Sequence, residues 1–234
     1  MGNIPQRVDF DARPPMPVLD YEQTVKRVNV GYDLVLTLTG CVLRALQQPE
    51  LQLLVIGAGG GAEIAQFLPE NPGWRVTGID PSRDMLALAQ AKAARLGVLE
   101  QVNLIQGTVA DLPAAARFDA ATCLFVLHFL PDAAKLALLR GIAARLQPEA
   151  PLLVVSGVQP EDGGLRDDFL GAWQQYGERM GMPAERMAAT IEQVIAQPAT
   201  AEQDYRCLLR EAGFTRSARY FSVLGGGITG WLAR

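Results

Sequence analysis

The stretch LQLLVIGAGGGAEI, residues 51–64, decides the fold. Residues 51–57 form a short, mostly apolar run, which is typical of a strand buried on both faces of a parallel sheet. Glycines follow at once, and the segment after them, 62–68, has the pattern of a helix that Pro69 ends. The stretch therefore predicts a buried strand, a tight turn and a helix in immediate succession.

The same alternation continues outward along the chain. Helices are expected after Ser82, whose side chain would cap the first turn, and over 132–146. Strands that alternate with helices indicate the α/β class, with a doubly wound and mostly parallel sheet. Four further apolar segments are predicted to be strands: 74–80, 102–107, 118–127 and 151–157.

Near the end of the chain the pattern changes. A helix is expected over 204–214, and the two β-rich segments that follow it are joined by a short glycine turn, so they must pair antiparallel. Prolines in 1–19 predict an extended arm or lid. We expect one domain in four parts: an N-terminal arm with helices (1–50), a cofactor-binding core (51–157), a helical insertion as substrate wall (158–205), and a C-terminal helix end with antiparallel strands (206–234).

The glycine turn predicts a ligand site. Gly57, Gly59 and Gly61 let the backbone turn tightly and let a ligand approach closely, and Ala58 lies between them. Asp80 stands 21 residues after Gly59, at the end of the next strand, where its carboxylate could accept both hydroxyls of an adenosine ribose. A plain strand-to-helix turn is the alternative.

A dinucleotide also fits this turn, because Gly57, Gly59 and Ala62 satisfy G-x-G-x-x-A. Three features favour S-adenosylmethionine instead. About fifty residues, largely helical, precede the first strand, the third strand runs into GTVADLP (107–113), and the terminal strands are antiparallel.

The motifs LLVIGAGGGAEI, VTGIDPS, GTVADLP, FDAATCLFVLHFL and LLREAGF, in this order, resemble those of the class I S-adenosylmethionine-dependent methyltransferases over roughly 51–234. The resemblance implies a seven-stranded sheet of order 3-2-1-4-5-7-6 with its last strand antiparallel. It also implies that Asp80 holds the ribose and that the remaining cofactor contacts come from Pro81 and Met85 at the adenine, Thr108 and Val109 at its edge, and Leu124 near the cofactor.

A second resemblance lies outside the core. Residues 26–40, KRVNVGYDLVLTLTG, and the C-terminal segment are similar to carboxy-S-adenosylmethionine synthases of tRNA wobble-uridine modification. It implies that Tyr32 covers the methionine end of the cofactor, with packing on the core as the alternative. The chain departs from its relatives at Val55 and Thr108, where acids are common, and at Leu124 and Leu208, which replace the synthases' asparagine and carboxylate-binding arginine.

Composition excludes several classes of protein. The 21 basic and 25 acidic residues leave a net charge of −4, without the positive footprint of a nucleic-acid-binding protein. The three cysteines are widely spaced and His128 is the single histidine, so no metal site is expected. No segment has the apolar length of a membrane span or the form of a signal peptide, which favours a cytoplasmic location.

Three functions stay open. The first is methyl transfer from S-adenosylmethionine to a small, partly apolar acceptor, which needs alignment of the reactants more than catalytic side chains. His128 is then the candidate general base, with a packed structural role as the alternative. The others are a carboxy-S-adenosylmethionine synthase-like enzyme and a non-catalytic cofactor-binding module. The N-terminal helices and the second resemblance favour a homodimer.

Overall fold

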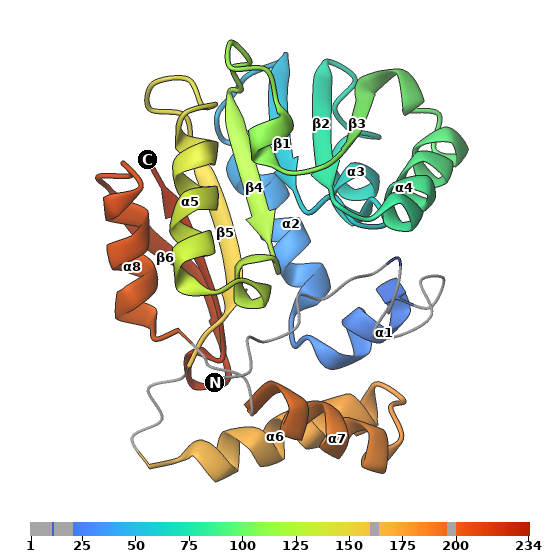
Figure 1. The fold of residues 1–234 in the computed structure, drawn as a ribbon. Helices are drawn as coiled ribbons and strands as arrows, with labels where there is room; N and C mark the ends of the chain where they lie inside the picture. Colours follow the sequence, from blue (N-terminus) through green and yellow to red (C-terminus); the bar gives the residue numbers. More distant parts are fainter. Residues whose placement is uncertain (1–10, 12–20, 160–163, 196–199) are drawn as a thin grey trace.

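The computed structural model describes residues 11, 21–159, 164–195 and 200–234. Its centre is a seven-stranded sheet of order β3-β2-β1-β4-β5-β7-β6, which confirms the order implied by the class I resemblance (Figure 1). The strands are β1 (Leu51–Ile56), β2 (Trp74–Asp80), β3 (Val102–Gln106), β4 (Ala120–Leu124), β5 (Leu152–Gly157), β6 (Ser217–Val223) and β7 (Ile228–Ala233).

The strand order switches sides at β1: β2 and β3 are added on one side of it, and β4 and β5 on the other. This strand pairs in parallel with β2 on one side and with β4 on the other. Of the strands, β7 runs antiparallel to both of its neighbours, β5 and β6. In such a sheet a crevice forms outside the carboxyl ends of the strands at the reversal point, which is where ligands bind.

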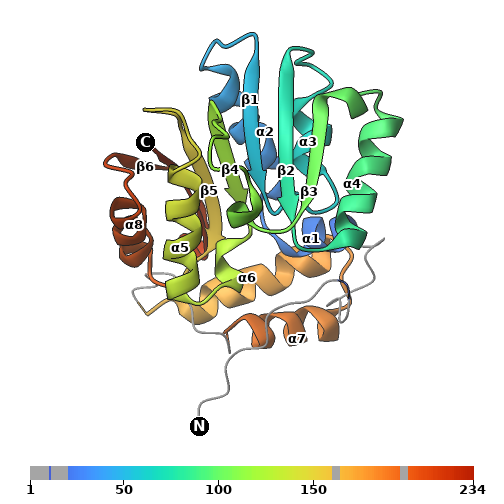
Figure 2. The ribbon, with the colours of Figure 1, turned by 45° about the horizontal axis from the view of Figure 1, so that its top comes forward.

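Helices cover both faces of the sheet (Figures 1 and 2). On one face lie α2 (Tyr32–Arg44), α3 (Ala62–Phe67) and α4 (Arg83–Arg95), and on the other lie α5 (Asp132–Ala143) and α8 (Glu202–Glu211). Leu53 and Val55 of β1 pack into the core on the side of α2, α3 and α4, and Leu54 and Ile56 pack into the core on the side of α5 and α8. Because both faces are covered, β1 is apolar along most of its length.

Three helices lie beyond the carboxyl ends of the strands (Figure 1). The pair α6 (Arg166–Arg179) and α7 (Ala184–Ile195) packs on α1 (Tyr21–Val28), where Trp173 Nε1 donates a hydrogen bond to the Val28 carbonyl at 2.7 Å. They therefore form a layer below the sheet edge. The arm predicted over 1–19 lies outside the described residues except for Asp11.

The predicted strand 118–127 is too long at its carboxyl end, because β4 ends at Leu124. Phe125 adopts a φ of 60°, which a strand cannot continue through, and a short 3-10 turn (Leu127–Phe129) follows. The apolar sequence runs on past Leu124 because these residues line a cavity and fill the core beneath it.

Candidate functional site

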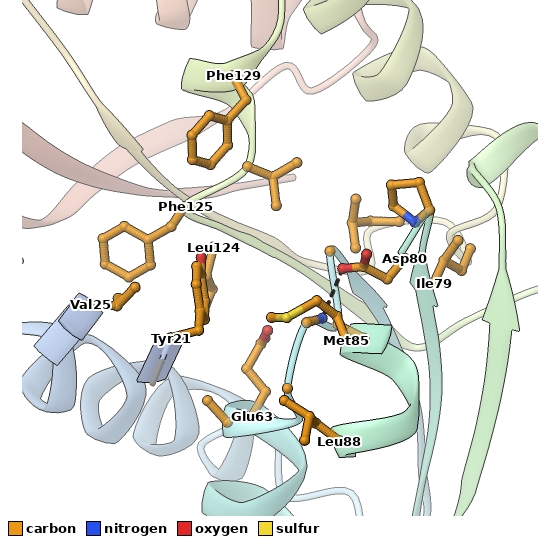
Figure 3. A pocket seen from close by; sticks show the side chains of 18 of the residues that line it. Tyr21, Val25, Glu63, Ile79, Asp80, Met85, Leu88, Leu124, Phe125 and Phe129 are labelled. Carbon is orange, nitrogen blue, oxygen red and sulfur yellow. Dashed lines mark hydrogen bonds between the residues drawn. The ribbon is translucent and has the colours of Figure 1, made fainter. Parts of the chain in front are cut away.

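A cavity of about 670 Å³ lies at the carboxyl ends of β1, β2 and β4, within the range of roughly 300 to 1,000 Å³ that is common for ligand pockets (Figure 3). Of the residues predicted from the sequence to bind the cofactor, all but Gly61 line it. They are Tyr32, Gly57, Ala58, Gly59, Asp80, Pro81, Met85, Thr108, Val109 and Leu124. The structure thus brings together side chains from four strand ends and from α2 and α4.

The glycine turn forms the floor between β1 and α3. Gly57 has a φ of 69° and donates a backbone hydrogen bond to the Ile79 carbonyl at 2.8 Å. A Cβ at Gly57 would lie 2.4 Å from Val126 Cγ2, so the turn has no room for a side chain. Gly61 instead serves helix packing, because a Cβ there would approach Ala89 Cα of α4 at 3.0 Å.

Asp80 ends β2 as a buried carboxylate beside this turn. Its Oδ2 accepts a hydrogen bond from Gly59 N at 2.9 Å, which is the dashed line in Figure 3. Its Oδ1 accepts one from Ser82 N, also at 2.9 Å. Burial raises the pKa of Asp80, and these two donors oppose that shift. Each carboxylate oxygen keeps a free lone pair for a ligand hydroxyl. Ser82 caps α4 as predicted, accepting from Met85 N at 3.1 Å.

The wall beside Asp80 is held rigid by local hydrogen bonds. Thr108 and Asp111 form a capping box at the short turn after β3, in which Asp111 Oδ2 accepts from Thr108 N at 2.7 Å. Val109 is buried against Gly141 of α5. The acid of this segment, Asp111, therefore binds the turn itself.

The opposite wall is aromatic. The rings of Tyr32 and Phe125 stack with their centroids 5.4 Å apart. Phe129 lies on the same side of the cavity as Phe125 (Figure 3). Burial, reinforced by the charge of Asp80, raises the pKa of Tyr21 to about 12, so this phenol is neutral at physiological pH. Val25 and Leu36 complete an apolar surface contributed by α1 and α2.

Glu63 also lines the cavity, although the sequence analysis did not single it out. Its position in the first turn of α3, within AEIAQFL, suggests only an ordinary helical residue. In the structure the side chain is 6% exposed, and Oε1 has no hydrogen-bond partner among the described residues. The signal that could have found it is a lone acid directly after a glycine turn.

His128 is not among the lining residues. Its Nδ1 accepts a hydrogen bond from Gly157 N at 3.3 Å, and its ring packs on Phe129 with centroids 4.2 Å apart. Burial lowers the pKa of His128 to about 4, and the charge of Lys135 adds to this shift. These contacts favour the packed structural role over the alternative of a general base. In the described part of the chain, no group of three His, Cys, Asp or Glu side chains could hold a metal ion.

No described residue of the insertion 158–205 lines the cavity, although this segment was expected to form the substrate wall. The helices α6 and α7 pack behind α1 instead, and α1 contributes the wall residues. Leu208 likewise packs against the core around α5 and does not reach the cavity.

Both α1 and Asp11 contact α4 beside the cavity. Glu22 of α1 forms ion pairs with Lys92 of α4 and with Lys26 of its own helix. Asp11 accepts hydrogen bonds from Ser82 Oγ at 2.5 Å and from Arg83 N at 3.0 Å at the start of α4. The chain before β1 therefore contacts α4 at two separate places.

Comparison with known proteins identifies the domain. Residues 54–152 match the model of a methyltransferase domain family. The chain is 30% identical over 155 residues to carboxy-S-adenosyl-L-methionine synthase of Wolinella succinogenes, covering 65% of this chain and 62% of that one. It is 27% identical over 186 residues to the ubiquinone/menaquinone biosynthesis C-methyltransferase UbiE of Sinorhizobium fredii, covering 74% and 69%.

Among solved structures, the chain resembles magnesium protoporphyrin IX methyltransferase of Synechocystis PCC 6803 with bound SAH. The TM-score is 0.65 at 19% identity, with 97% of this chain and 96% of that one covered, which shows a shared fold. The chain spans less than two thirds of the length of the first curated relatives that it matches.

These findings confirm the class I resemblance. The methyltransferase-domain match covers residues 54–152, and the relatives together with the fold shared with an SAH-bound methyltransferase support S-adenosylmethionine as the cofactor. No helix within the described ranges is both long enough and apolar enough to cross a membrane.

Proposed function

We propose that the chain transfers the methyl group of S-adenosylmethionine to a small, largely apolar acceptor. One observation carries the proposal: a single cavity joins the glycine turn and Asp80 on one side to the aromatic wall of Tyr32, Phe125 and Phe129 on the other. The first side offers what an adenosyl group needs, and the second offers an apolar surface to an acceptor.

The cofactor contacts of this proposal come from the lining residues. Asp80 would accept the ribose hydroxyls, Pro81, Met85, Thr108 and Val109 would enclose the adenine, and Gly57, Ala58 and Gly59 would allow close approach of the chain to the ligand. Tyr32 and Leu124 would face the methionine end. Gly61 supports the same turn from behind.

When bound, the cofactor supplies a methyl group on a sulfonium sulfur, and the methyl carbon exchanges its bond to sulfur for one to the acceptor. The protein has to align the acceptor in line with that bond and exclude water. The aromatic wall suits this role, because the Tyr32 and Phe125 rings are fixed by stacking and α1 covers them. Such chemistry asks for few catalytic side chains.

Adding a side chain at the glycine turn tests whether the cavity binds the cofactor. Gly57→Ala is expected to abolish measurable S-adenosylhomocysteine binding, since the new methyl group would meet Val126 and the positive φ costs a further ~1–2 kcal/mol. Gly97→Ala is the matched control, because Gly97 has a φ of 71° with nothing within 4 Å of a Cβ. The Gly97→Ala variant should lose stability through a similar backbone strain, while its affinity for S-adenosylhomocysteine, measured by calorimetry, stays that of the wild type. Equal affinities of the two variants for this ligand would contradict the assignment.

The direct test is titration calorimetry with S-adenosylmethionine, S-adenosylhomocysteine and NAD, followed by a screen of apolar acceptors for a mass gain of one methyl group. Binding of the first two ligands with methylated product supports the proposal. Binding of NAD alone would overturn it in favour of the dinucleotide interpretation. Cofactor binding without product from any acceptor would favour the non-catalytic module.

A carboxy-S-adenosylmethionine synthase-like activity is the second candidate, and the 30% identity to the Wolinella succinogenes enzyme favours it. An extra carboxylate on the ligand needs a cation or donors to offset its desolvation. Among the described lining residues the cations are Lys92 and Arg95, both on α4, and Lys92 is paired with Glu22. Mass spectrometry of ligand carried through purification separates the two, because only this candidate yields a carboxylated sulfonium.

Homodimer formation and a cytoplasmic location stay predictions. Cys41 and Cys207 are exposed free thiols and Cys123 is a buried one, in keeping with a reducing compartment. Light scattering of the purified chain measures the oligomeric state directly.

A further inference from the structure

The cavity holds one carboxyl group whose interactions are incomplete. Glu63 of α3 is 6% exposed, lines the cavity, and has an Oε1 with no hydrogen-bond partner among the described residues. Burial raises the pKa of Glu63 to about 7, and the neighbouring buried hydroxyl of Thr122 opposes this shift, although no hydrogen bond of good geometry joins the two. Burying an unpaired carboxylate is costly, so a group in this state calls for a partner that arrives with a ligand.

The protein itself brings no positive charge to Glu63. The titratable groups that sense its charge are Tyr32 of α2, Cys123 of β4 and Tyr220 of β6, and burial raises the pKa of each. All three are therefore neutral near pH 7. The Tyr220 hydroxyl is already hydrogen-bonded to Thr39 Oγ1 at 3.0 Å. Lys92, a cation of the cavity lining, is paired with Glu22.

The position of Glu63 suits one end of the cofactor. It rises from α3 into the space beside Met85, opposite the wall where Phe129 lies (Figure 3). In the proposed binding mode Asp80 contacts the ribose, on the other side of the glycine turn from Glu63. A ligand whose ribose contacts Asp80 and whose chain crosses that turn would present its amino-acid end to Tyr32 and Glu63.

We propose that Glu63 forms a cation subsite that binds the α-ammonium group of the cofactor's amino-acid end. This inference rests on the proposed function, because it assumes that the cavity takes an S-adenosyl amino acid. The carboxylate accepts a hydrogen bond from the ammonium group, and the ion pair supplies the positive charge that no described titratable group of the protein brings to Glu63.

The test compares two ligands that differ in this end alone. S-adenosylhomocysteine carries the ammonium group, and 5′-methylthioadenosine lacks the amino-acid end. Glu63→Gln is expected to weaken the binding of the first by about 10- to 100-fold, the range of a lost charge-assisted hydrogen bond, and to leave the second unchanged. Glu22→Gln is the matched control, because Glu22 also lines the cavity but has lysine partners; it should not alter the ratio of the two affinities.

Proton linkage supplies a second readout. Binding an ammonium group requires ionised Glu63, so the wild-type affinity for S-adenosylhomocysteine should rise between pH 6 and 8 with release of a proton, and the glutamine variant should show neither effect. Proton release is measured by calorimetry in two buffers of different ionisation enthalpy.

The outcomes separate this subsite from the proposed function. If the wild-type protein binds neither ligand, the proposed function falls and the subsite falls with it. If the wild-type protein binds both but Glu63→Gln weakens both equally, or weakens neither, the subsite alone is overturned. A ligand-specific loss together with the lost pH dependence supports it.

Discussion

Replacing Asp80 by asparagine is expected to lower the affinity for S-adenosylhomocysteine by roughly 100-fold, equivalent to about 3 kcal/mol. Two effects add. The substitution removes the charge that strengthens hydrogen bonds from the ribose hydroxyls. It also turns an amide NH2 group toward a backbone donor, either Gly59 N or Ser82 N, which the carboxylate now accepts at 2.9 Å on both sides. Titration calorimetry measures the loss.

Asp84→Asn is the matched control for this change. Asp84 lies in the first turn of the same helix, α4, is exposed and does not line the cavity, so its replacement removes the same charge from the same neighbourhood. We expect an affinity within twofold of the wild type. Equal losses in both variants would show that overall charge near α4 governs binding, and the ribose contact assigned to Asp80 would be wrong.

The fold could be predicted from the sequence because its signals are local. Each parallel strand is covered by helices on both faces, so β1 and β5 stand out as apolar runs between turns. Ser82 marks the start of α4 by its own hydrogen bond. The end of β4 was missed for the opposite reason: Phe125 turns away from the sheet at a positive φ, and its apolar side chain carries no local mark of that turn.

From the sequence, only those site residues could be predicted whose position is fixed by the ends of the strands. Gly57 and Asp80 stand at strand ends, whose places are fixed by the sheet order, and so they meet at the cavity. Glu63 was missed because the titratable groups near it belong to β4, α2 and β6, which come from distant parts of the chain. The neighbours of the insertion could not be predicted, because helical spacing alone cannot tell which element its aromatic residues contact, and Trp173 packs on α1.

Glu63→Gln is expected to stabilise the ligand-free protein at pH 8 by about 3 kcal/mol. The pKa of Glu63 is raised from 4.5 to about 7 by burial, so the folded state binds its proton more tightly than the unfolded state does. The stability that this proton contributes is complete below pH 4.5 and is lost as the pH rises through 7. Glutamine stays neutral throughout, and the variant should therefore melt higher at pH 8, by about 6 to 12 °C for a chain of this size.

The pH dependence makes this prediction specific. Thermal melts of both proteins without ligand should converge near pH 4.5 and separate progressively toward pH 8. Glu100→Gln, which removes an exposed carboxylate from the surface, should follow the wild type at every pH. A constant gap at all pH values would mean that glutamine merely packs better, and no gap would mean that Glu63 ionises at little cost. A gain in stability that accompanies weaker cofactor binding would instead show that the fold retains a costly buried carboxyl group because the ligand needs it.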